Sequence, residues 1–485
     1  MTGISVTGGR DRSGTSCGSA IRVTSLPIRV TTRGSDCRES GALPSRRAGR
    51  LRKRWGTVPA DSSRAVLAGT IGAMKPLDTD VLVIGAGPTG SAAAAWSARA
   101  GLDVLVIDSQ DFPRDKACGD GLTPRAIAEL TRIGMAPWLS HRPRNWGLRA
   151  AGFGQVWHLP WPGGSMPSHG SAAARVELDA EVLAVARDSG ARFVGGLKVA
   201  DIKPDSTGRI REVTAADGTV IACRRVVVAD GARSPVGRLL RRQWHQETVF
   251  GVAARAYVDS DRADDPWISS HLELRGDAGE LLSGYGWIFP LGNGQVNLGV
   301  GTLATDRRPA AVNLRRLIAH YHRSQSDPWE LTSGPRKVKS ALLPMGGAVS
   351  GVAGPNWVLA GDAAGCVNPL NGEGIDYGLE TGRLAAELLA SSHESTDLSV
   401  SWVDTLTTRY GPAFSAARRL AGLLTAPEFL RTAGPVGMRS RPLMTVALRV
   451  MGNLVTPEDT DAVARLWRGL GATSLRLDHR PPFAA

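Results

Sequence analysis

Cysteine is scarce in this chain of 485 residues, and the few cysteines are widely scattered. There are five of them, an odd number, and no two form a CxxC pair. Such a set predicts neither a disulfide framework nor a zinc site, and it is typical of a protein in a reducing compartment. We therefore expect no bound metal.

Long apolar runs are also absent. The sequence contains no window of 18 or more consecutive apolar residues, so we expect no helix that spans a bilayer. The N-terminus lacks the compact charged-then-apolar arrangement of a secretory signal. Within these limits the composition, 42% apolar and 21% charged, predicts an ordinary soluble globular protein with two packed domains or one elaborated one.

Acidic residues are few in the first 73 residues. That segment holds thirteen Lys and Arg against four Asp and Glu, so it contributes +9 of the net charge of +13. The remainder contains no zinc finger, RNP-type aromatic motif or basic stripe interleaved with aromatics, and we predict no nucleic-acid binding. Residues 1–73 are predicted to be a disordered or untranslated basic tail, with Met74 as the true start. A transit peptide is the competing interpretation.

What the sequence does contain begins with a strand, a turn, a helix and a second strand. The segment DVLVI occurs at residues 80–84 and again at 103–107, and an alanine-rich helix former lies between them at residues 91–100. This order predicts the start of a doubly wound parallel sheet.

The turn within this unit has the sequence GAGPTG at residues 85–90. Gly85 permits the tight turn, Gly87 lets the backbone approach a pyrophosphate, and Gly90 lets the helix pack on the strand. The pyrophosphate then lies at the positive N-terminus of the helix. Asp108 ends the second strand, where an acid accepts a hydrogen bond from a ribose hydroxyl. Together these features predict a bound dinucleotide.

A second group of small residues, far along the chain, decides between NAD and FAD. Residues 357–365 (WVLAGDAAG) predict a strand that delivers Asp362 beside glycines. Gly374 and Ile375 begin a predicted helix. The backbone N–H groups at its start would face the flavin pyrimidine ring, where negative charge collects on reduction. A structural turn and a capped helix are the alternative. Because a nicotinamide dehydrogenase has no need of this second site, FAD is the predicted cofactor.

The two parts of the nucleotide-binding half are separated by an insertion. Short, alternating, glycine-punctuated runs after residue 251 predict an antiparallel sheet there. We expect an α/β fold with a split FAD-binding Rossmann-like domain, an inserted antiparallel-sheet substrate domain and a helical C-terminal region. The predicted segments are 74–250 and 346–395 for the FAD-binding domain, 251–345 for the substrate domain and 396–485 for the helical region.

Several motifs resemble known flavoproteins. The turn at Gly85, residues 230–234 (DGARS) and Gly361-Asp362 together resemble the p-hydroxybenzoate hydroxylase type. Residues 113–121 (PRDKACGDG) and 284–290 (GYGWIFP) resemble the geranylgeranyl reductase family, whose members use FAD to saturate isoprenoid double bonds. The resemblance covers residues 74–485. It is greatest to the bacterial members that reduce one isoprene unit of the menaquinone side chain.

The resemblance implies roles that spacing alone does not assign. It places the glycine turn and Asp108 on the ADP half of FAD, and Cys118 alongside the flavin. Arg175 matches a flavin-contacting arginine of the family. The implied cofactor-binding residues are Gly85, Ala86, Gly87, Pro88, Thr89, Gly90, Ser91, Asp108, Cys118, Gly119, Asp120, Gly121, Arg175, Asp362, Gly374 and Ile375.

Tyr285, Trp287 and Phe289 are implied to line the substrate pocket. Because they alternate, they fall on one strand face and equally suit an ordinary core. Cys118 also has two interpretations, as a small buried residue or as the proton donor to the double bond. Asp120 and Tyr285 are the other candidate donors, and Cys118 is the predicted catalytic residue.

A polyprenyl quinone such as menaquinone lies in the bilayer, so the resemblance implies a peripheral enzyme at the cytoplasmic face of the bacterial cell membrane. Residues 420–454 place apolar side chains among arginines, which suits an amphipathic surface on anionic headgroups. A helix packed on the core is the alternative. The electron donor is left open between NAD(P)H and an electron-transfer protein, because no second GxGxxG domain of the glutathione-reductase kind is found.

Other functions fit parts of the sequence. A reductase of geranylgeranyl lipids or other polyprenyl compounds shares every motif. An FAD-dependent aromatic monooxygenase shares the FAD-binding body but consumes oxygen together with NAD(P)H. A flavin-dependent halogenase needs a catalytic lysine, and a non-enzymatic lipid carrier leaves the mass of its lipid unchanged.

Overall fold

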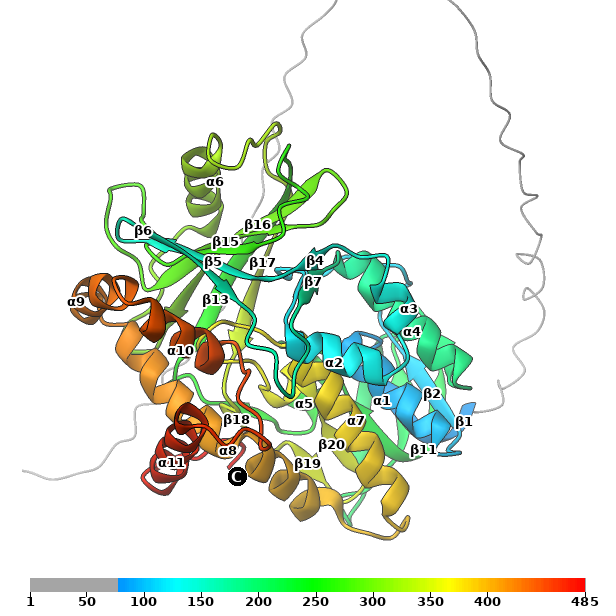
Figure 1. Ribbon diagram of the computed structural model, residues 1–485. Helices are drawn as coiled ribbons and strands as arrows, with labels where there is room; N and C mark the ends of the chain where they lie inside the picture. Colours follow the sequence, from blue (N-terminus) through cyan, green and yellow to red (C-terminus); the bar gives the residue numbers. More distant parts are fainter. Residues whose placement is uncertain (1–76, 485) are drawn as a thin grey trace, which may run out of the picture. The chain divides into compact units, whose positions relative to one another are not determined.

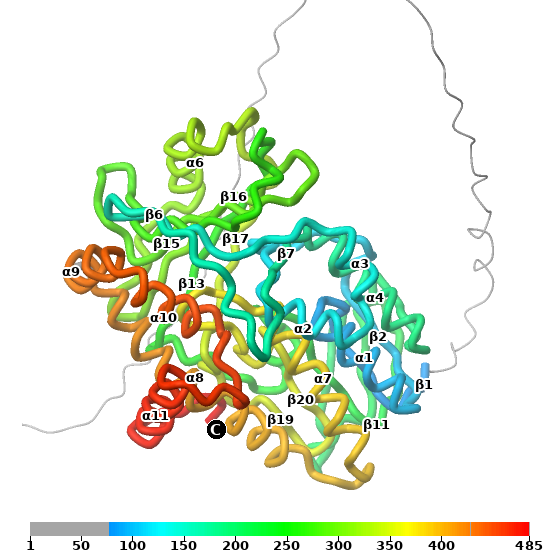
Figure 2. Tube along the Cα trace, in the orientation of Figure 1, coloured from blue at the N-terminus to red at the C-terminus, as the bar shows by residue number. Residues whose placement is uncertain are grey.

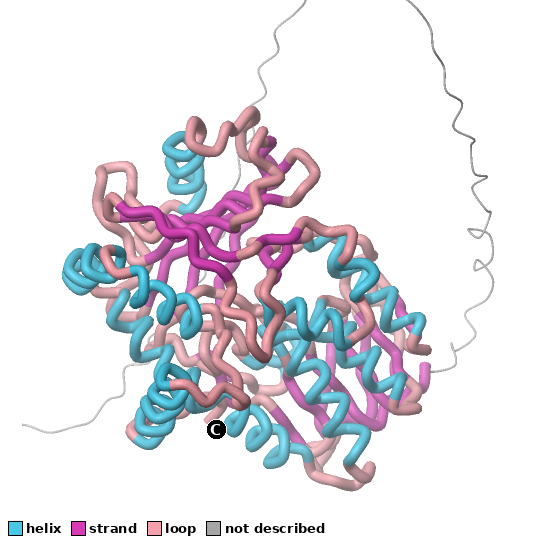
Figure 3. The backbone as a smooth tube through the Cα atoms, viewed as in Figure 1, coloured by secondary structure: helices cyan, strands magenta, loops and turns pink. Residues whose placement is uncertain are grey.

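The computed structural model describes residues 77–484, and the predictions for residues 1–73 lie outside this range. The described chain contains two large sheets, with helices around them and loops where the sheets meet (Figures 1 and 3). The predicted α/β class with a helical C-terminal region is confirmed.

The first large sheet has a parallel centre. Its parallel strands, in spatial order, are β8 (Arg192–Val194), β2 (Val104–Ile107), β1 (Leu77–Ile84), β11 (Val220–Val228) and β20 (Trp357–Leu359). Three further strands pair in antiparallel orientation with this sheet: β9 (Val199–Pro204), β10 (Ile210–Ala215) and β19 (Ala353–Gly354). All four residues of β2 are buried, as expected of a parallel strand that is covered on both faces.

Helix α1 (Pro88–Arg99) follows β1 and packs between α4 (Arg175–Asp188) and α7 (Ile375–Ser391). The approach of α7 to α1 is very close, because a Cβ at Gly382 would lie 2.4 Å from the carbonyl oxygen of Thr89. Glycine on α7 therefore lets a helix from late in the sequence lie directly on the first helix.

The second large sheet is antiparallel apart from the β14–β5 pair. In spatial order its strands are β17 (Arg336–Pro344), β13 (Phe250–Asp259), β16 (Gln295–Ala304), β15 (Gly284–Pro290), β14 (Ile268–His271), β5 (Gly147–Gly152) and β6 (Gln155–Pro160). Helix α6 (Leu314–Gln325) covers one face with Leu317, Ile318 and Tyr321. The sheet thus draws its strands from two separate stretches of sequence. The segment boundaries given above remain predictions.

Short elements connect the two sheets. A three-stranded sheet consists of β3 (Gly121–Leu122), β7 (Gly170–Ala172) and β4 (Arg144–Asn145), and a two-stranded one of β12 (Gln243–Trp244) and β18 (Val349–Ser350). The short helices are α2 (Pro124–Arg132), α3 (Ala136–Leu139), α5 (Pro235–Leu239) and the 3₁₀ helix η1 (Gly361–Ala364).

Four helices form the C-terminal region: α8 (Leu398–Leu424), α9 (Pro427–Met438), α10 (Arg441–Met451) and α11 (Ala462–Arg476). The Cα trace shows α9 and α10 beside the second sheet (Figure 2). Helix α8 contacts β19 and β20 of the first sheet and β16 of the second. Among residues 77–484 no helix combines the length and the apolarity needed to cross a bilayer.

Candidate active site

Two glycines of the turn after β1 leave no room for a side chain. Gly85 has a φ of 104°, and a Cβ there would lie 2.4 Å from the carbonyl oxygen of Ala229. A Cβ at Gly90 would lie 1.8 Å from the carbonyl oxygen of Gly85. The tight turn and the close packing of helix on strand therefore both require glycine at these positions.

Gly87 caps the N-terminus of α1 and faces guanidinium groups. A Cβ at Gly87 would lie 3.5 Å from Nη2 of Arg114 and 3.8 Å from Nη2 of Arg175. The fully buried Asp179 accepts hydrogen bonds from Arg114 Nη1 at 3.0 Å and from Arg175 Nη2 at 2.8 Å, and so fixes both side chains. Two fixed cations beside a helix N-terminus suit the pyrophosphate of a dinucleotide.

Asp108 lies at the end of β2, next to the turn. Its Oδ2 accepts a hydrogen bond from the backbone N–H of Ala86 at 2.9 Å, so the carboxylate also holds the turn in place. Of the predicted ADP-side residues, those that line the adjacent cavity are Gly85, Gly87, Pro88, Thr89 and Asp108. Ala86, Gly90 and Ser91 are buried beneath them.

The residues from the second part of the FAD-binding half meet this turn from the other side. Asp362 lies in η1, directly after β20, and its Oδ2 is 3.2 Å from Nζ of Lys116. A Cβ at Gly374 would lie 2.9 Å from Oδ1 of Asp362. Gly374 is the N-cap of α7, and Asp362, Gly374 and Ile375 all line the cavity. The N-termini of α1 and α7 therefore open on the same space.

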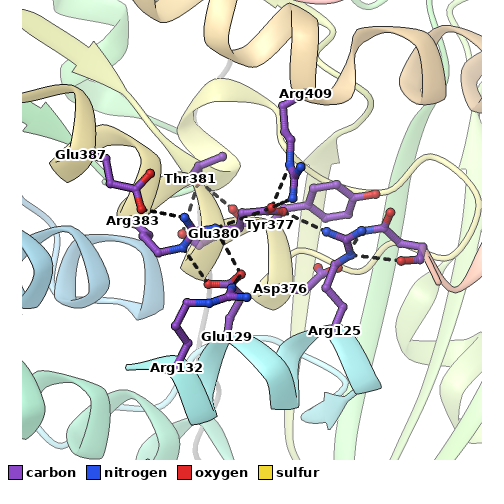
Figure 4. A network of polar contacts seen from close by, with 12 residues as sticks. Arg125, Glu129, Arg132, Asp376, Tyr377, Glu380, Thr381, Arg383, Glu387 and Arg409 are labelled. Atoms are coloured by element: carbon purple, nitrogen blue, oxygen red, sulfur yellow. Dashed lines mark hydrogen bonds and ion pairs between the residues drawn. The ribbon is translucent and has the colours of Figure 1, made fainter. Parts of the chain in front are cut away.

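Helix α7 is held in position by buried ion pairs (Figure 4). The fully buried carboxylate of Glu380 pairs with Arg125 of α2 at 3.1 Å and with Arg409 of α8. Arg383, one turn further along α7, pairs with Glu129 of α2 at 3.2 Å. Because removing one partner would leave an uncompensated buried charge, these pairs fix α7 against α2 and α8.

The same network reaches the C-terminal helices. Asn453, just after α10, donates a hydrogen bond from Nδ2 to Oδ2 of Asp376 at 3.0 Å, and its carbonyl accepts one from Nε of Arg125 at 3.1 Å. Asp376 is the second residue of α7. The end of α10 is thus joined to the start of α7.

The loop that carries Cys118 lies against the aromatic residues of β15. A Cβ at Gly119 would lie 3.3 Å from Nε1 of Trp287, and one at Gly121 would lie 2.9 Å from Cε2 of Phe289. The two motifs that resemble the geranylgeranyl reductase family, distant in sequence, therefore meet in space. Glycine in the loop makes this contact possible.

Cys118 itself is half-buried and lines the cavity. Burial raises the pKa of its thiol above the ordinary value, while the Arg175 guanidinium acts in the opposite direction. The backbone N–H of Asp120 lies 3.4 Å from Sγ. With a raised pKa the thiol keeps its proton at neutral pH, which a proton donor must do.

Behind Cys118, Asp120 is the centre of a buried polar network. Its Oδ2 accepts hydrogen bonds from Tyr257 Oη at 2.7 Å and from Asn297 Nδ2 at 2.8 Å. Asn297 also donates to the carbonyl of Cys118 at 2.9 Å and accepts from Nε1 of Trp287 at 2.9 Å. Burial raises the pKa of Asp120 to about 6. One network therefore orients both the Cys118 loop and the Trp287 indole.

Tyr285, Trp287 and Phe289 share one face of β15 and line the cavity. Their neighbouring ring centroids are 5.9 Å and 6.3 Å apart. The opposite face of β15 packs against α6, since a Cβ at Gly286 would lie 2.4 Å from the ring of Tyr321. All three rings line the cavity, and their role in substrate binding stays a prediction.

A single cavity of about 770 Å³ joins these elements. We call the part near the glycine turn, Asp108 and Asp362 its polar end. The part beyond the aromatic residues is its apolar end, which α8, α9 and α10 line with Leu424, Leu430, Ala433, Gly434, Gly437, Met438, Met444, Ala447, Leu448 and Met451.

Several residues of the site were not predicted from the sequence. Arg114 lies within the PRDKACGDG motif and was passed over, and Asp179 carries only a weak signal, its spacing of four residues from Arg175 on a helix. Tyr257 and Asn297 carry no local signal, because each reaches Asp120 from a different strand.

Comparison with known proteins identifies the family. Residues 78–397 match the FAD binding domain family. The chain is 61% identical to a menaquinone reductase of Mycobacterium tuberculosis (strain ATCC 25618 / H37Rv) over 405 residues, which is 84% of this chain and 98% of that protein. The chain belongs to the geranylgeranyl reductase family of FAD-dependent oxidoreductases. The predicted family, the FAD cofactor and the oxidoreductase class are thereby confirmed.

A more distant relative and a solved structure agree with this placement. Digeranylgeranylglycerophospholipid reductase 1 of Methanopyrus kandleri is 29% identical over 365 residues, 72% of this chain and 91% of that protein. The solved structure of a geranylgeranyl bacteriochlorophyll reductase-like protein from Thermoplasma acidophilum superimposes with a TM-score of 0.67 at 19% identity. It covers 82% of this chain and all of the other, a likeness that shows the fold of the family.

Proposed function

We propose that this enzyme saturates a C=C bond in the polyprenyl side chain of menaquinone. The observation that carries the proposal is the meeting of the Cys118 loop with the aromatic face of β15, where the polar end of the cavity joins its apolar end. An isoprenoid chain in the apolar end would lie along Tyr285, Trp287 and Phe289 and beside Cys118.

The polar end fits FAD. The N-terminus of α1 with Arg114 and Arg175 would hold the pyrophosphate, and Asp108 the ADP ribose. Asp362 would hold the ribityl chain, and the N-terminus of α7 would face the isoalloxazine. FAD, when bound and reduced, supplies the hydride for one carbon of the double bond.

The protein supplies what the second carbon needs. The Cys118 thiol, which keeps its proton, is the proposed donor to that carbon. The aromatic rings stabilise the positive character that develops at an isolated double bond, because their π faces attract cations. The apolar residues of α9 and α10 keep water away from this carbon.

Menaquinone is proposed as the substrate because the relative with 61% identity is a menaquinone reductase. The electrons are proposed to come from NAD(P)H, bound transiently, or from an electron-transfer protein, since the sequence has no second dinucleotide-binding domain of the glutathione-reductase kind.

A peripheral position at the cytoplasmic face of the membrane is proposed from the outer side of α8–α10. Their inner sides line the apolar end, yet their outer sides expose large apolar residues, namely Leu423, Phe429, Val436 and Leu443. Arg431, Arg439 and Arg441 are exposed on the same helices. Apolar side chains next to cations suit contact with anionic headgroups.

Mass spectrometry of quinones from cells with and without the gene tests the proposal. We expect a menaquinone two mass units heavier than its unsaturated form that disappears on deletion and returns on complementation. An unchanged quinone profile, with a shift in other polyprenyl lipids instead, would leave the family assignment intact and reject the substrate.

A further inference from the structure

Three small residues lie side by side on the second sheet, one on each of three adjacent strands. Ala253 of β13 is opposite Ala341 of β17 on one side and Gly301 of β16 on the other. Residues directly opposite each other in an antiparallel sheet point to the same face, so the three form one row. Tyr285 of β15 lies opposite Gly301 and ends the row. All four residues are half-buried and line the main cavity, so the row faces that cavity.

Large side chains cover the sheet on either side of this row. A Cβ at Gly299, two residues before the row on β16, would lie 2.1 Å from Cζ2 of Trp287, so the indole covers this glycine. A Cβ at Gly251, two residues before the row on β13, would lie 2.3 Å from Cε of Met345, which covers this one. Because β13 and β16 run antiparallel, the two covers lie on opposite sides of the row.

The row itself is not covered in this way. A Cβ added at Gly301 would lie 3.5 Å from Cζ3 of Trp287 and 3.8 Å from Cβ of Ala253, which are ordinary contact distances. We call the space above Ala253, Gly301 and Ala341 the slot. Its floor is the row of small residues, and its walls are Trp287 and Met345.

The shape of the slot suits a flat group. Its floor spans three strands, about 10 Å at the usual strand spacing, which is wider than a single isoprenoid chain. Trp287 borders it along one side and Tyr285 at one end, and flat aromatic groups bind favourably against such rings. Lys339 lies two residues from Ala341 on β17 and also lines the cavity. Its ammonium group can donate a hydrogen bond to a carbonyl oxygen at the edge of the slot.

The slot also lies on the aromatic face that meets the Cys118 loop. Trp287, one of its walls, contacts this loop at Gly119, and Phe289 follows two residues further along β15. Phe289 packs in an apolar cluster with Met444 and Leu448 of α10. A chain that starts in the slot and follows these two rings would therefore pass the Cys118 loop before it reaches the C-terminal helices.

We propose that the slot holds the fused-ring head of the quinone, flat against Ala253, Gly301 and Ala341, with Lys339 at a ring carbonyl. The side chain then extends along Trp287 and Phe289 past the Cys118 loop. This inference rests on the proposed function and deepens it. It assigns the residues that distinguish a quinone from a polyprenyl lipid with a different head.

The test uses three ligands that separate the head from the tail. Dimethylnaphthoquinone is the ring with a methyl group in place of the tail, geranylgeraniol is a tail without the ring, and menaquinone with a geranylgeranyl tail contains both. Equilibrium dialysis against oxidised, FAD-loaded enzyme gives the Kd of the first two. Enzyme whose FAD has been photoreduced before mixing gives the rate at which the side chain of the third is saturated, followed by mass spectrometry.

Gly301→Ala raises the floor of the slot by one methyl group at a position where the fold has room for it. We expect the Kd of dimethylnaphthoquinone to rise about tenfold, the effect of one methyl group in a fitted site. The Kd of geranylgeraniol should stay within about twofold of wild type. The rate of saturation of subsaturating menaquinone should fall about tenfold. Gly301→Val, which fills more of the slot, should enlarge the first and third effects.

Gly334→Ala is the matched control. Gly334 lies just before β17 on the same sheet, outside the cavity lining, and no described atom lies within 4 Å of an added Cβ. This variant should bind all three ligands as wild type does. FAD content and melting temperature establish that each variant is folded and loaded.

The outcomes separate the two hypotheses. Wild-type enzyme that binds dimethylnaphthoquinone but never saturates the side chain would reject the proposed function and leave the ring site standing. An unchanged Kd of dimethylnaphthoquinone in both Gly301 variants, or an equal loss for geranylgeraniol, would overturn the inference alone. Loss of FAD from Gly301→Ala would also overturn it, because the slot would then hold the isoalloxazine.

Discussion

The polar and apolar ends of the cavity are built by different means. The polar end combines main-chain atoms at the starts of α1 and α7 with charged side chains, and Gly85 and Gly90 leave no room for a side chain in the turn before α1. The apolar end is lined by aromatic and apolar side chains, such as Trp287 and Met438, on β15 and the C-terminal helices. We therefore expect FAD binding to depend on the backbone of the turn as well as on charged side chains, whereas the proposed substrate pocket depends on side chains that can be exchanged one at a time.

The largest effect is expected at the polar end. Gly90→Val should abolish FAD binding, because even a Cβ would lie 1.8 Å from the carbonyl oxygen of Gly85 and the turn must open. Flavin absorbance of the purified protein measures the loss. Gly469→Ala, on α11 with open space around it, should retain full FAD. A Gly90→Val protein that carries stoichiometric FAD would contradict the backbone argument.

At the junction of the two ends, Cys118→Ser should separate chemistry from cofactor binding. We expect kcat for menaquinone reduction to fall at least about 100-fold, since a serine hydroxyl is a far weaker acid than a thiol, with FAD content unchanged. Product mass spectrometry gives the rate. Cys223→Ser, in the core of the first sheet, serves as the control. Unchanged product formation in Cys118→Ser would reject its role as proton donor.

A smaller effect is expected on the outer side of the apolar end. The double variant Phe429→Ser/Leu443→Ser should weaken binding to phosphatidylglycerol vesicles about 30-fold, because each apolar side chain buried in a membrane interface contributes ~1 kcal/mol. Vesicle co-sedimentation measures the affinity, and turnover of a short-tailed quinone in detergent should not change.

The matched control for the membrane experiment is Val400→Ser. Val400 is 66% exposed but lies near the start of α8, the opposite end of this 27-residue helix from Leu424. An equal loss of vesicle binding in Val400→Ser would show that general surface apolarity, and not the α9–α10 face, governs the interaction.

The smallest expected effect is on the stability of the protein, through the buried hydrogen-bond network of Asp120 that lies between the polar and apolar ends of the cavity. Burial raises the folded-state pKa of Asp120 to about 6, above its ordinary value of 3.8. The folded protein therefore binds this proton more tightly than the unfolded chain, and the free energy of unfolding falls as pH rises from about 4 to about 6. Between pH 5 and pH 7, Asp120 should lower the free energy of unfolding by about 1 kcal/mol.

Asp120→Asn isolates this contribution. Burial also raises the pKa of Asp376 to about 6, so the wild-type profile alone combines both groups. In urea unfolding of FAD-loaded protein, the free energy of unfolding of wild type minus that of the variant should be about 1 kcal/mol lower at pH 7 than at pH 5. A difference independent of pH would mean that Asp120 does not titrate in this range.

Much of the polar end could be predicted because its signals are local. The turn at Gly85 and the acid at Asp108 lie within one β-α-β unit, and the helix start at Gly374 is visible in the sequence. The structure places all three at one cavity. Arg114 and Asp179 were missed, although the turn faces the guanidinium groups that Asp179 holds. Their roles depend on a contact between separate elements.

Only part of the apolar end of the cavity could be predicted from the sequence. Alternation on β15 showed that Tyr285, Trp287 and Phe289 share a face, but not whether that face is core or cavity. The answer depends on α6, which covers the opposite face, and on the C-terminal helices, which leave space on this one.

The sequence by itself determined the α/β class and the FAD cofactor, because glycine spacing and buried strand patterns are properties of contiguous residues. Its motifs also carried the resemblance to the family. Only the tertiary structure decided that the Cys118 loop lies on Trp287 and that Asp120 binds Tyr257 and Asn297. These contacts join residues that are distant along the chain, and their distances are set by how the sheets and helices pack, which no local pattern encodes.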